Sequence, residues 1–209
     1  MKFVSLISSG IDSPVATYFF SKKSTELILI HADGRPYTDN REVNNFMSIA
    51  KSLKKQTKIK MKFFLIPHGK NLNIYQKNCN KKYTCIFCKR MLLKYAESIL
   101  IENEASAIIM GDSLGQVASQ TLYNIKVIDQ AVNTPILRPL IGLDKDNIIK
   151  IARKIGTYYI SILPKDGCNA VPSKPSTKCK LENILGEEEK IKVEKLVIDS
   201  IKQKEELFI

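Results

Sequence analysis

The chain has 209 residues, of which 44% are hydrophobic, and carries a formal net charge of +12. This length and composition suit one α/β domain with its own hydrophobic core. No apolar run approaches the roughly 18 residues of a membrane span, and the early charges of Lys22 and Lys23 argue against a signal peptide. Five cysteines, an odd number, make a disulfide framework unexpected and predict a reduced, cytoplasmic protein.

The positive charge is unevenly distributed along the chain. Residues 43–96 contain no Asp or Glu but many lysines, including Lys81 and Lys82, whereas residues 179–209 contain six lysines and eight acids. A stretch with charge of one sign is typical of a surface that binds a polyanion such as RNA. General use of lysine on the protein surface is the alternative explanation.

The first predicted elements surround a turn of small residues. Residues 3–7 are apolar except for Ser5, which predicts a buried strand, and Asp12 and Pro14 predict a helix over residues 12–21, with Asp12 as its cap. Between them, residues 8–10 are small. Such a turn directs unpaired backbone N–H groups to one point, which favours phosphate binding. The Gly-Lys-Ser/Thr ending of a Walker A loop is absent. An ordinary turn that binds no phosphate remains an alternative interpretation.

Strands and helices are predicted to alternate along the rest of the chain. Further strands are predicted at residues 25–31, 61–67, 106–110 and 158–162, with an extended segment at 136–141. Helices are predicted at residues 39–55, 87–102, 116–124 and 146–155, and one or two amphipathic helices within 179–209. Residues 68–84 give no clear pattern, and residues 164–178 predict a loop. This order indicates an α/β fold with a doubly wound, mostly parallel sheet.

Several polar or small segments follow predicted strands. They are residues 8–13, His31 with Ala32, and Gly111 with Asp112. In a doubly wound sheet, ligands bind outside the carboxyl ends of the strands, so these segments are expected to share one crevice. Gln116 and Gln120 lie four residues apart, on one face of the predicted helix, and their amides suit a nucleotide. On composition alone, a plain helix start without a ligand is the favoured alternative.

Five motifs together resemble a known family. They are Ser-Gly-Ile-Asp-Ser-Pro-Val-Ala, Lys-Arg-Met, Gly-Asp-Ser-Leu-Gly-Gln-Val-Ala-Ser-Gln-Thr-Leu, Leu-Arg-Pro-Leu-Ile and Ile-Gly-Thr. The first resembles the Ser-Gly-Gly-X-Asp-Ser loop of the ATP pyrophosphatases, or PP-loop enzymes, with Ser9 at the first glycine position. Residues 1–178 resemble the adenylating domain of the tRNA 4-thiouridine synthetase and thiamine-biosynthesis sulfurtransferase family. We therefore expect a PP-loop domain over 1–178 and a helical tail over 179–209.

The resemblance implies both a reaction and a set of nucleotide contacts. Members of this family transfer AMP from ATP to a uridine oxygen, release pyrophosphate, and replace the activated oxygen with sulfur to give 4-thiouridine. Asp12 would help to hold the Mg²⁺-bound leaving group. The implied ATP contacts are Leu6, Ile7, Ser8, Gly10, Ser13, His31, Ala32, Lys89, Gly111 and Gln120.

The cysteines suggest a second site, for a metal or for sulfur transfer. Cys85 and Cys88 form a CxxC motif at a predicted helix start, which alone fits a zinc half-site, a redox pair, an iron–sulfur half-site or buried packing. The family resemblance implies that Cys168 acts in sulfur transfer and that Cys85, Cys88 and Cys168 hold an iron–sulfur cluster, in preference to zinc. Cys79 and Cys179 are expected not to be ligands.

The expected partners are ATP, tRNA and a sulfur donor, either sulfide or a persulfide carrier, with no membrane. The sequence shows no counterpart of the family's ferredoxin-like, THUMP or rhodanese regions, so tRNA is expected to be bound with help from a separate THUMP-containing protein. Whether the chain forms a homodimer remains undecided. Two other functions also remain possible from the sequence: a PP-loop enzyme acting on a small molecule, and a nucleotide- or RNA-binding subunit that needs a partner for the chemistry. The PP-loop ligase that makes a deazaguanine nitrile would show four clustered cysteines near the C-terminus, which this chain lacks.

Overall fold

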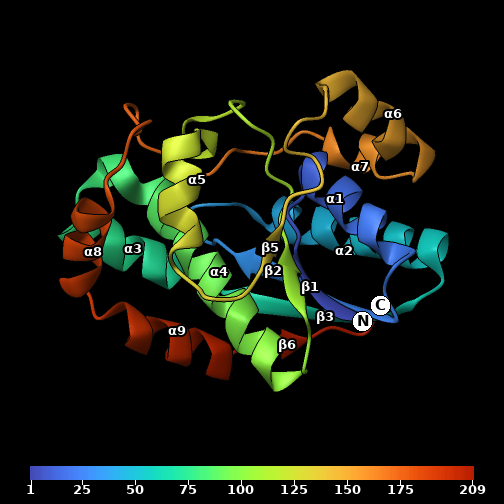
Figure 1. Cartoon of the computed structure of the whole chain (residues 1–209), viewed down its shortest axis with the longest axis horizontal. Coiled ribbons are helices and arrows are strands. Elements are labelled where there is room, and N and C mark those ends of the chain that lie inside the picture. Colours follow the sequence, from blue (N-terminus) through green and yellow to red (C-terminus); the bar gives the residue numbers. More distant parts are fainter.

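A six-stranded sheet with the strand order β5-β4-β1-β2-β3-β6 runs through the computed structural model, which describes all 209 residues (Figure 1). The strands are β1 (Lys2–Leu6), β2 (Glu26–Asp33), β3 (Lys60–Pro67), β4 (Ala107–Ile109), β5 (Ile136–Leu137) and β6 (Glu205–Glu206). Only the pairing of β3 with β6 is antiparallel. The predicted α/β class with a mostly parallel sheet is confirmed.

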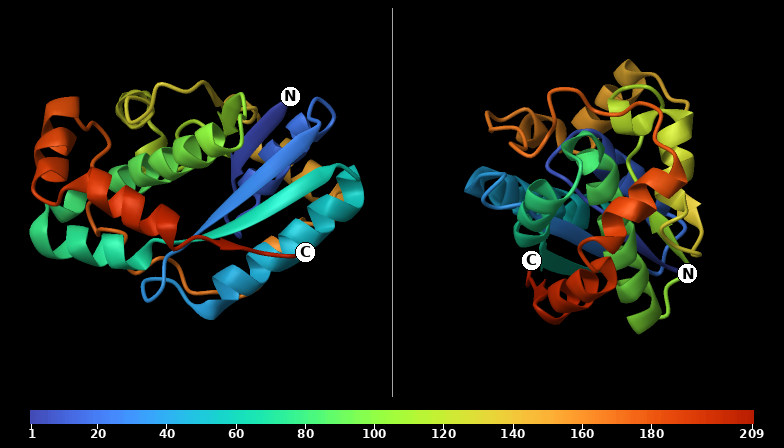
Figure 2. Two further views of the ribbon diagram at one scale, coloured as in Figure 1. Left: turned by 90° about the horizontal axis from the view of Figure 1, so that it is seen from below. Right: turned by 90° about the vertical axis from the view of Figure 1, so that its left-hand side faces the viewer.

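Helices cover both faces of the sheet (Figure 2). The α-helices are α1 (Asp12–Ser21), α2 (Asn40–Thr57), α3 (Gly69–Asn78), α4 (Thr84–Glu102), α5 (Leu122–Asp129), α6 (Lys145–Lys154), α7 (Tyr158–Ser161), α8 (Leu181–Glu189) and α9 (Val193–Lys202). Short 3₁₀ helices are η1 (Lys81–Tyr83) and η2 (Ala118–Gln120).

Alternate residues of each central strand enter different hydrophobic cores. In β1, Val4 packs in the core with α4 and α9, whereas its neighbour Phe3 packs in the core with α1, α2 and α6. A strand that is buried on both faces must be apolar at consecutive positions. This requirement explains why the central strands are recognisable in the sequence as nearly unbroken apolar runs.

Two predicted elements are wrong. Residues 158–162 do not form a strand but contain the helix α7, which packs against α2 and α6. The packing against these helices outweighs the preference of Tyr and Ile for β-strands. The helix predicted over 116–124 is not formed either. Gly115 has φ +74° and Thr121 is extended, and Thr121 caps α5 with its hydroxyl, so a turn and η2 precede a later helix.

Smaller differences concern helix starts and weakly patterned segments. Asp12 is the first residue of α1 rather than its cap, because Ile11 already has helical dihedral angles. Residues 68–84 form α3 and η1. The strand β6 follows α9 and pairs with β3 at the sheet edge. None of the helices is both long and apolar enough to cross a membrane.

The C-terminal helices share a core with the rest of the chain. Ile184 of α8 and Val197 of α9 pack in the same cluster as α4. Arg90 of α4, only 2% exposed, donates from Nε to Glu188 Oε1 at 2.6 Å and from Nη2 to Glu188 Oε2 at 2.9 Å. Residues 179–209 thus pack on α4 and form hydrogen bonds with it. The boundary predicted at residue 178, between a PP-loop domain and a helical tail, remains a prediction.

The buried Arg90–Glu188 pair leads to a stability prediction. Arg90→Met should lower the free energy of unfolding by about 3–5 kcal/mol, because it leaves the Glu188 carboxylate buried without a partner. Urea unfolding measures this loss. Lys94→Met is the matched control, since its partner Glu194 is 77% exposed, and should cost less than about 1 kcal/mol. An unchanged urea midpoint in Arg90→Met would show that the pair does not hold the tail in place.

Candidate functional site

One cavity lies at the carboxyl ends of β1, β2 and β4. Its volume is about 310 Å³. All ten residues that the family resemblance assigns to ATP contacts line it, and so does Asp12. The fold therefore brings together the three expected segments, although their contacts with a nucleotide remain a prediction.

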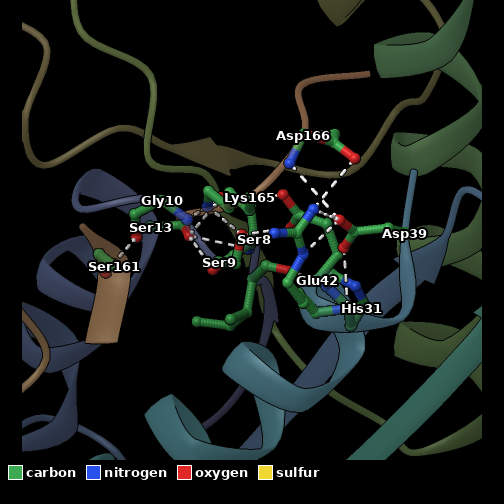
Figure 3. Close-up of polar contacts among 12 residues, drawn as sticks. Ser8, Ser9, Gly10, Ser13, His31, Asp39, Glu42, Ser161, Lys165 and Asp166 are labelled. Carbon is green, nitrogen blue, oxygen red and sulfur yellow. Dashed lines mark hydrogen bonds and ion pairs between the residues drawn. The ribbon is translucent and has the colours of Figure 1, made fainter. Parts of the chain in front are cut away.

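The loop between β1 and α1 is held by its own serine side chains (Figure 3). Ser8 N donates to Ser13 Oγ at 2.9 Å, and Gly10 N donates to Ser8 Oγ at 3.2 Å. The loop leads directly into α1, whose first-turn N–H groups lack intrahelical acceptors. Helix starts of this kind can bind phosphate, so phosphate binding by residues 8–13, called the phosphate loop below, remains a prediction.

Gly111 sets how closely β4 approaches this loop. A Cβ atom on Gly111 would lie 2.5 Å from Ser13 Cα and 2.6 Å from Ser13 N, both backbone atoms of α1 that cannot move aside easily. Only glycine allows the chain leaving β4 to contact the helix start, and this contact forms the floor of the cavity.

Asp112 organises the opposite wall of the cavity. Its side chain accepts from Lys89 Nζ at 2.6 Å, from Arg138 Nε at 3.0 Å and from Gln120 Nε2 at 3.3 Å. Burial alone would raise the pKa of Asp112, but the charges and hydrogen bonds of Lys89 and Arg138 outweigh burial and hold that pKa below its usual value. Asp112 therefore stays ionised and fixes the position of Lys89.

Gln120 presents an acceptor without a partner. Its amide nitrogen donates to Asp112, while its Oε1 is buried and has no hydrogen-bond partner. Because Gln120 lines the cavity, this oxygen can accept from an N–H or O–H group of a ligand. Gln116 does not line the cavity and accepts from Lys145 Nζ at 3.4 Å. The predicted common helix face of the two glutamines is therefore wrong.

Two lysines from the later part of the chain contact the phosphate loop. Lys145 Nζ forms an ion pair with Asp12 Oδ1. Lys165 Nζ donates to Ser9 Oγ and lies 3.5 Å from Glu42 Oε1 (Figure 3). No sequence motif points to either lysine. Together with Lys89, they place three ammonium groups close to one anion-binding loop.

The segment that carries Cys168 is fastened beside the same loop. Ser161 Oγ donates to Gly10 O at 3.2 Å (Figure 3). Asp166 Oδ2 lies 3.0 Å from Arg41 Nη2, and Asn169 N donates to Tyr37 O at 2.9 Å. These contacts, with Lys165, attach residues 161–169 to the phosphate loop and to the residues that follow β2.

Cys85, Cys88 and Cys168 lie near one another, but none of them lines the cavity. Burial, together with smaller effects of the nearby Cys85 and Cys168, raises the pKa of the Cys88 thiol to about 12. Burial likewise raises the pKa of Cys85, with Cys168 adding to the effect. No group of three or more His, Cys, Asp or Glu side chains is arranged so that it could hold a metal ion.

The other two cysteines contact the C-terminal part of the chain. Cys79 Sγ donates to Glu187 O at 3.3 Å, and Cys179 is buried in the core beside α4. Both therefore have structural surroundings, which suits the expectation that neither is a ligand.

Both histidines are buried. His31 stacks on Phe46 and its Nδ1 lies 2.9 Å from Ile7 O. His68 Nε2 lies 3.3 Å from Cys88 Sγ, and His68 Nδ1 lies 3.1 Å from Tyr95 Oη. His68 thus touches the CxxC motif directly.

The buried histidines predict acid sensitivity. Burial lowers the pKa of His68 to about 4, below the ordinary 6.5 that the unfolded chain retains. Between pH 6.5 and 4 the unfolded state therefore binds a proton that the folded state does not. Stability should fall over this range by up to about 1.4 kcal/mol per pH unit and be unaffected by His68 above it.

Urea unfolding at pH 7, 6 and 5 tests this expectation. His68→Gln removes the titrating group, so its stability should depend less on pH than that of the wild-type chain. His31, whose pKa burial also lowers, accounts for the remaining dependence. Identical pH profiles for the two proteins would contradict a neutral, buried His68.

Comparison with known proteins identifies relatives of the whole chain. The family model described as thiamine biosynthesis protein (ThiI) matches residues 1–193. A probable tRNA sulfurtransferase of Methanothermobacter thermautotrophicus is 41% identical over 199 residues, which cover 95% of this chain and 51% of that protein. That of Methanobrevibacter smithii is 43% identical over 184 residues, covering 88% and 48%. The chain spans about half the length of these curated relatives.

Solved structures agree with the sequence comparison. A 4-thiouridine synthetase in complex with RNA and ATP superposes with a TM-score of 0.93 at 30% identity, over 99% of this chain and 54% of that one. NMN synthetase from Francisella tularensis has a TM-score of 0.57 at 13% identity, which shows a common fold alone.

Proposed function

The chain belongs to the ThiI family, and we propose from this premise that it is the ATP-dependent adenylating and sulfur-transferring part of a tRNA sulfurtransferase. The observation that carries the proposal is the cavity in which the phosphate loop, Lys89 and the unpaired acceptor of Gln120 face one space. The structural neighbour with TM-score 0.93 is a 4-thiouridine synthetase described with bound ATP and RNA.

ATP binding uses groups already in place. The triphosphate lies on the loop of residues 8–13, where N–H groups at the start of α1 and the charges of Lys89 and Lys145 neutralise it. Gln120 Oε1 accepts a hydrogen bond from the nucleoside. Leu6, Ile7, His31 and Ala32 form the wall beside it.

Mg²⁺ fits this arrangement through Asp12. The Asp12 carboxylate is a hard oxygen ligand beside the loop, and in the free protein it is paired with the ammonium of Lys145. A cation in contact with this carboxylate would offset the charge of the β- and γ-phosphates. Asp12 and Lys145 then remain next to the leaving pyrophosphate.

Adenylation follows from this placement. The O4 atom of a uridine attacks the α-phosphorus, and a new P–O bond forms as the bond between the α-phosphorus and the α,β-bridging oxygen breaks. The bonding electrons leave with pyrophosphate, whose charge Lys145 and Lys165 neutralise. The uridine C4–O bond thereby becomes a bond to a good leaving group, AMP.

Sulfur transfer completes the reaction at the cysteines. A sulfur nucleophile, sulfide or the terminal sulfur of a persulfide on Cys168, attacks C4, and the C4–O bond to AMP breaks. In the persulfide case the product is a C4–S–S–Cys168 disulfide. An external thiol then attacks Cys168 Sγ, the S–S bond breaks, 4-thiouridine is released, and the thiol becomes disulfide-bonded to Cys168. Cys85, Cys88 and Cys168 are soft donors of the type that hold iron–sulfur clusters, and by the family resemblance they would hold one, although in this structure they are not arranged as a metal-binding group.

RNA binding is proposed to use the acid-free stretch of residues 43–96, with help from a THUMP-containing partner. Lys81 and Lys82 lie exposed on η1. Replacing both with Glu should weaken tRNA binding about equally for all sequences and reduce its salt dependence, because phosphate contacts release counterions. Filter binding at several salt concentrations measures this change.

Lys22 and Lys23, exposed at the C-terminal end of α1, provide the matched control. The same charge reversal there should have little effect. Equal losses in the two double variants would point to the net charge alone and remove η1 from the RNA surface.

One reconstitution tests the function as a whole. The chain, prepared without oxygen, is incubated with ATP, Mg²⁺, sulfide and unmodified tRNA, with and without a THUMP protein of a relative. We expect one AMP and one pyrophosphate for each 4-thiouridine formed. AMP formation with a small molecule but not with tRNA would favour the alternative PP-loop function, and nucleotide binding without any cleavage would favour a binding subunit.

A further inference from the structure

A second hollow adjoins the nucleotide cavity. Its volume is about 440 Å³, and Leu114, Thr121, Tyr123 and Lys178 are among the residues that line it. The two spaces share one segment of the chain, because Leu114 and Thr121 line the hollow whereas Val117 and Gln120 line the cavity. A ligand in the hollow would therefore lie close to a ligand in the cavity.

The hollow exposes unusually large apolar side chains. Leu122 is 69% exposed, Tyr123 57% and Leu114 45%. Asn124, Val127 and Ile128 anchor α5 in the core, whereas Leu122 and Tyr123 at its start point away from that core. A group of exposed apolar residues next to a catalytic cavity is typical of a binding surface.

The walls of the hollow are fixed by hydrogen bonds. Thr121 Oγ1 donates to Thr177 O at 2.7 Å. Asn124, which is fully buried, donates from Nδ2 to Ser176 O at 2.8 Å and accepts from Cys179 N at 2.9 Å. The loop of residues 176–179 is thus tied to the start of α5, and Tyr123 and Lys178 are held on a preformed surface.

This surface is also positively charged. Lys178 Nζ lies 4.6 Å from the centroid of the Tyr123 ring. Residues 167–180 contain Lys174, Lys178 and Lys180 and no acid. Ser176 N donates to Lys82 O at 3.0 Å, so the basic stretch that includes η1 continues up to the hollow.

We propose that the hollow binds one unpaired RNA base, stacked on Tyr123, with its phosphate on Lys178. An exposed aromatic ring with a lysine ammonium over its face offers a stacking surface and a positive charge at one place, which match the flat face and the charge of a single-stranded nucleotide. When the base stacks on the ring, the ammonium moves from the ring face to the phosphate. An apolar peptide carries no negative charge to pair with the lysines, and an RNA duplex offers no unstacked base. The proposal rests on the proposed function, since the bound nucleotide adjoins the uridine that enters the cavity.

Short oligonucleotides test the hollow in the full chain. A fluorescent single-stranded oligouridylate is titrated by anisotropy against the wild type, Tyr123→Ala and Tyr123→Phe. Tyr159→Ala is the control, because Tyr159 is 67% exposed on α7 and does not line the hollow. We expect about tenfold weaker binding for Tyr123→Ala and affinity near that of the wild type for the other two variants. Lys178→Gln should lower the salt dependence by about one phosphate contact.

Three results would overturn the proposal. They are absence of oligouridylate binding to the wild type, unchanged binding in Tyr123→Ala, and an equal loss in Tyr159→Ala. Preference for duplex RNA of the same length would also contradict it. ATP cleavage is measured on the same samples, so a failure of the nucleotide chemistry is distinguished from a failure of the RNA hollow.

Discussion

Asp12→Ala should slow pyrophosphate release from ATP at least about 100-fold, the typical cost of removing a group that stabilises charge in the transition state. Asp12 lies at the start of α1, beside the phosphate loop, and is paired with Lys145. Its loss removes the carboxylate proposed to hold the cation on the leaving group and leaves Lys145 without its partner. A coupled assay for pyrophosphate measures the rate.

Two further variants separate this role from folding. Lys145→Ala should also slow release, because its ammonium is the second charge at the same point. Asp144→Ala removes an acid that precedes α6 and does not line the cavity, and it should release pyrophosphate at the wild-type rate. All three should unfold at similar urea concentrations. Wild-type release in Asp12→Ala would show that the loop is not used as proposed.

Cys168→Ala should abolish formation of 4-thiouridine while pyrophosphate release continues. The cysteine lies on a segment fastened to the phosphate loop through Ser161, but it does not line the cavity that contains that loop. The two half-reactions therefore depend on different side chains. Thiolated nucleoside and pyrophosphate are measured in the same reaction mixture.

The other cysteines give this prediction its controls. Cys85→Ala and Cys88→Ala should behave like Cys168→Ala, and each should lose the charge-transfer absorbance expected of protein purified without oxygen. Cys179 is buried in the core beside α4, and Cys179→Ala should keep both properties. Thiolation that persists in Cys168→Ala, or zinc held by four thiolates, would contradict the proposed sulfur site.

Local signals explain why the cavity could be predicted from sequence. The apolar run of β1, the small residues that follow and the first turn of α1 are contiguous, and the same pattern recurs at Gly111 after β4. In a parallel sheet such segments meet at the carboxyl edge. The family motifs then predict residues that line the cavity, and all ten do.

The residues without a sequence signal depend on pairings between distant parts of the chain. Lys145 contacts Asp12 across 133 residues, and Lys165 contacts Ser9 across 156. Nothing in the local sequence distinguishes these lysines from the many others. The strand β6 has only two residues and forms because the edge of β3 offers unpaired backbone groups. These features come from tertiary packing rather than from local preference.

The position at which ATP is cleaved tests the central proposal most directly. ATP labelled at the α-phosphate is incubated with the chain, Mg²⁺, sulfide and unmodified tRNA, and the products are separated by chromatography. Cleavage between the α- and β-phosphates predicts labelled AMP and an equal amount of pyrophosphate, both lost in Asp12→Ala. Labelled ADP with inorganic phosphate, or AMP formation that persists in Asp12→Ala, would contradict it.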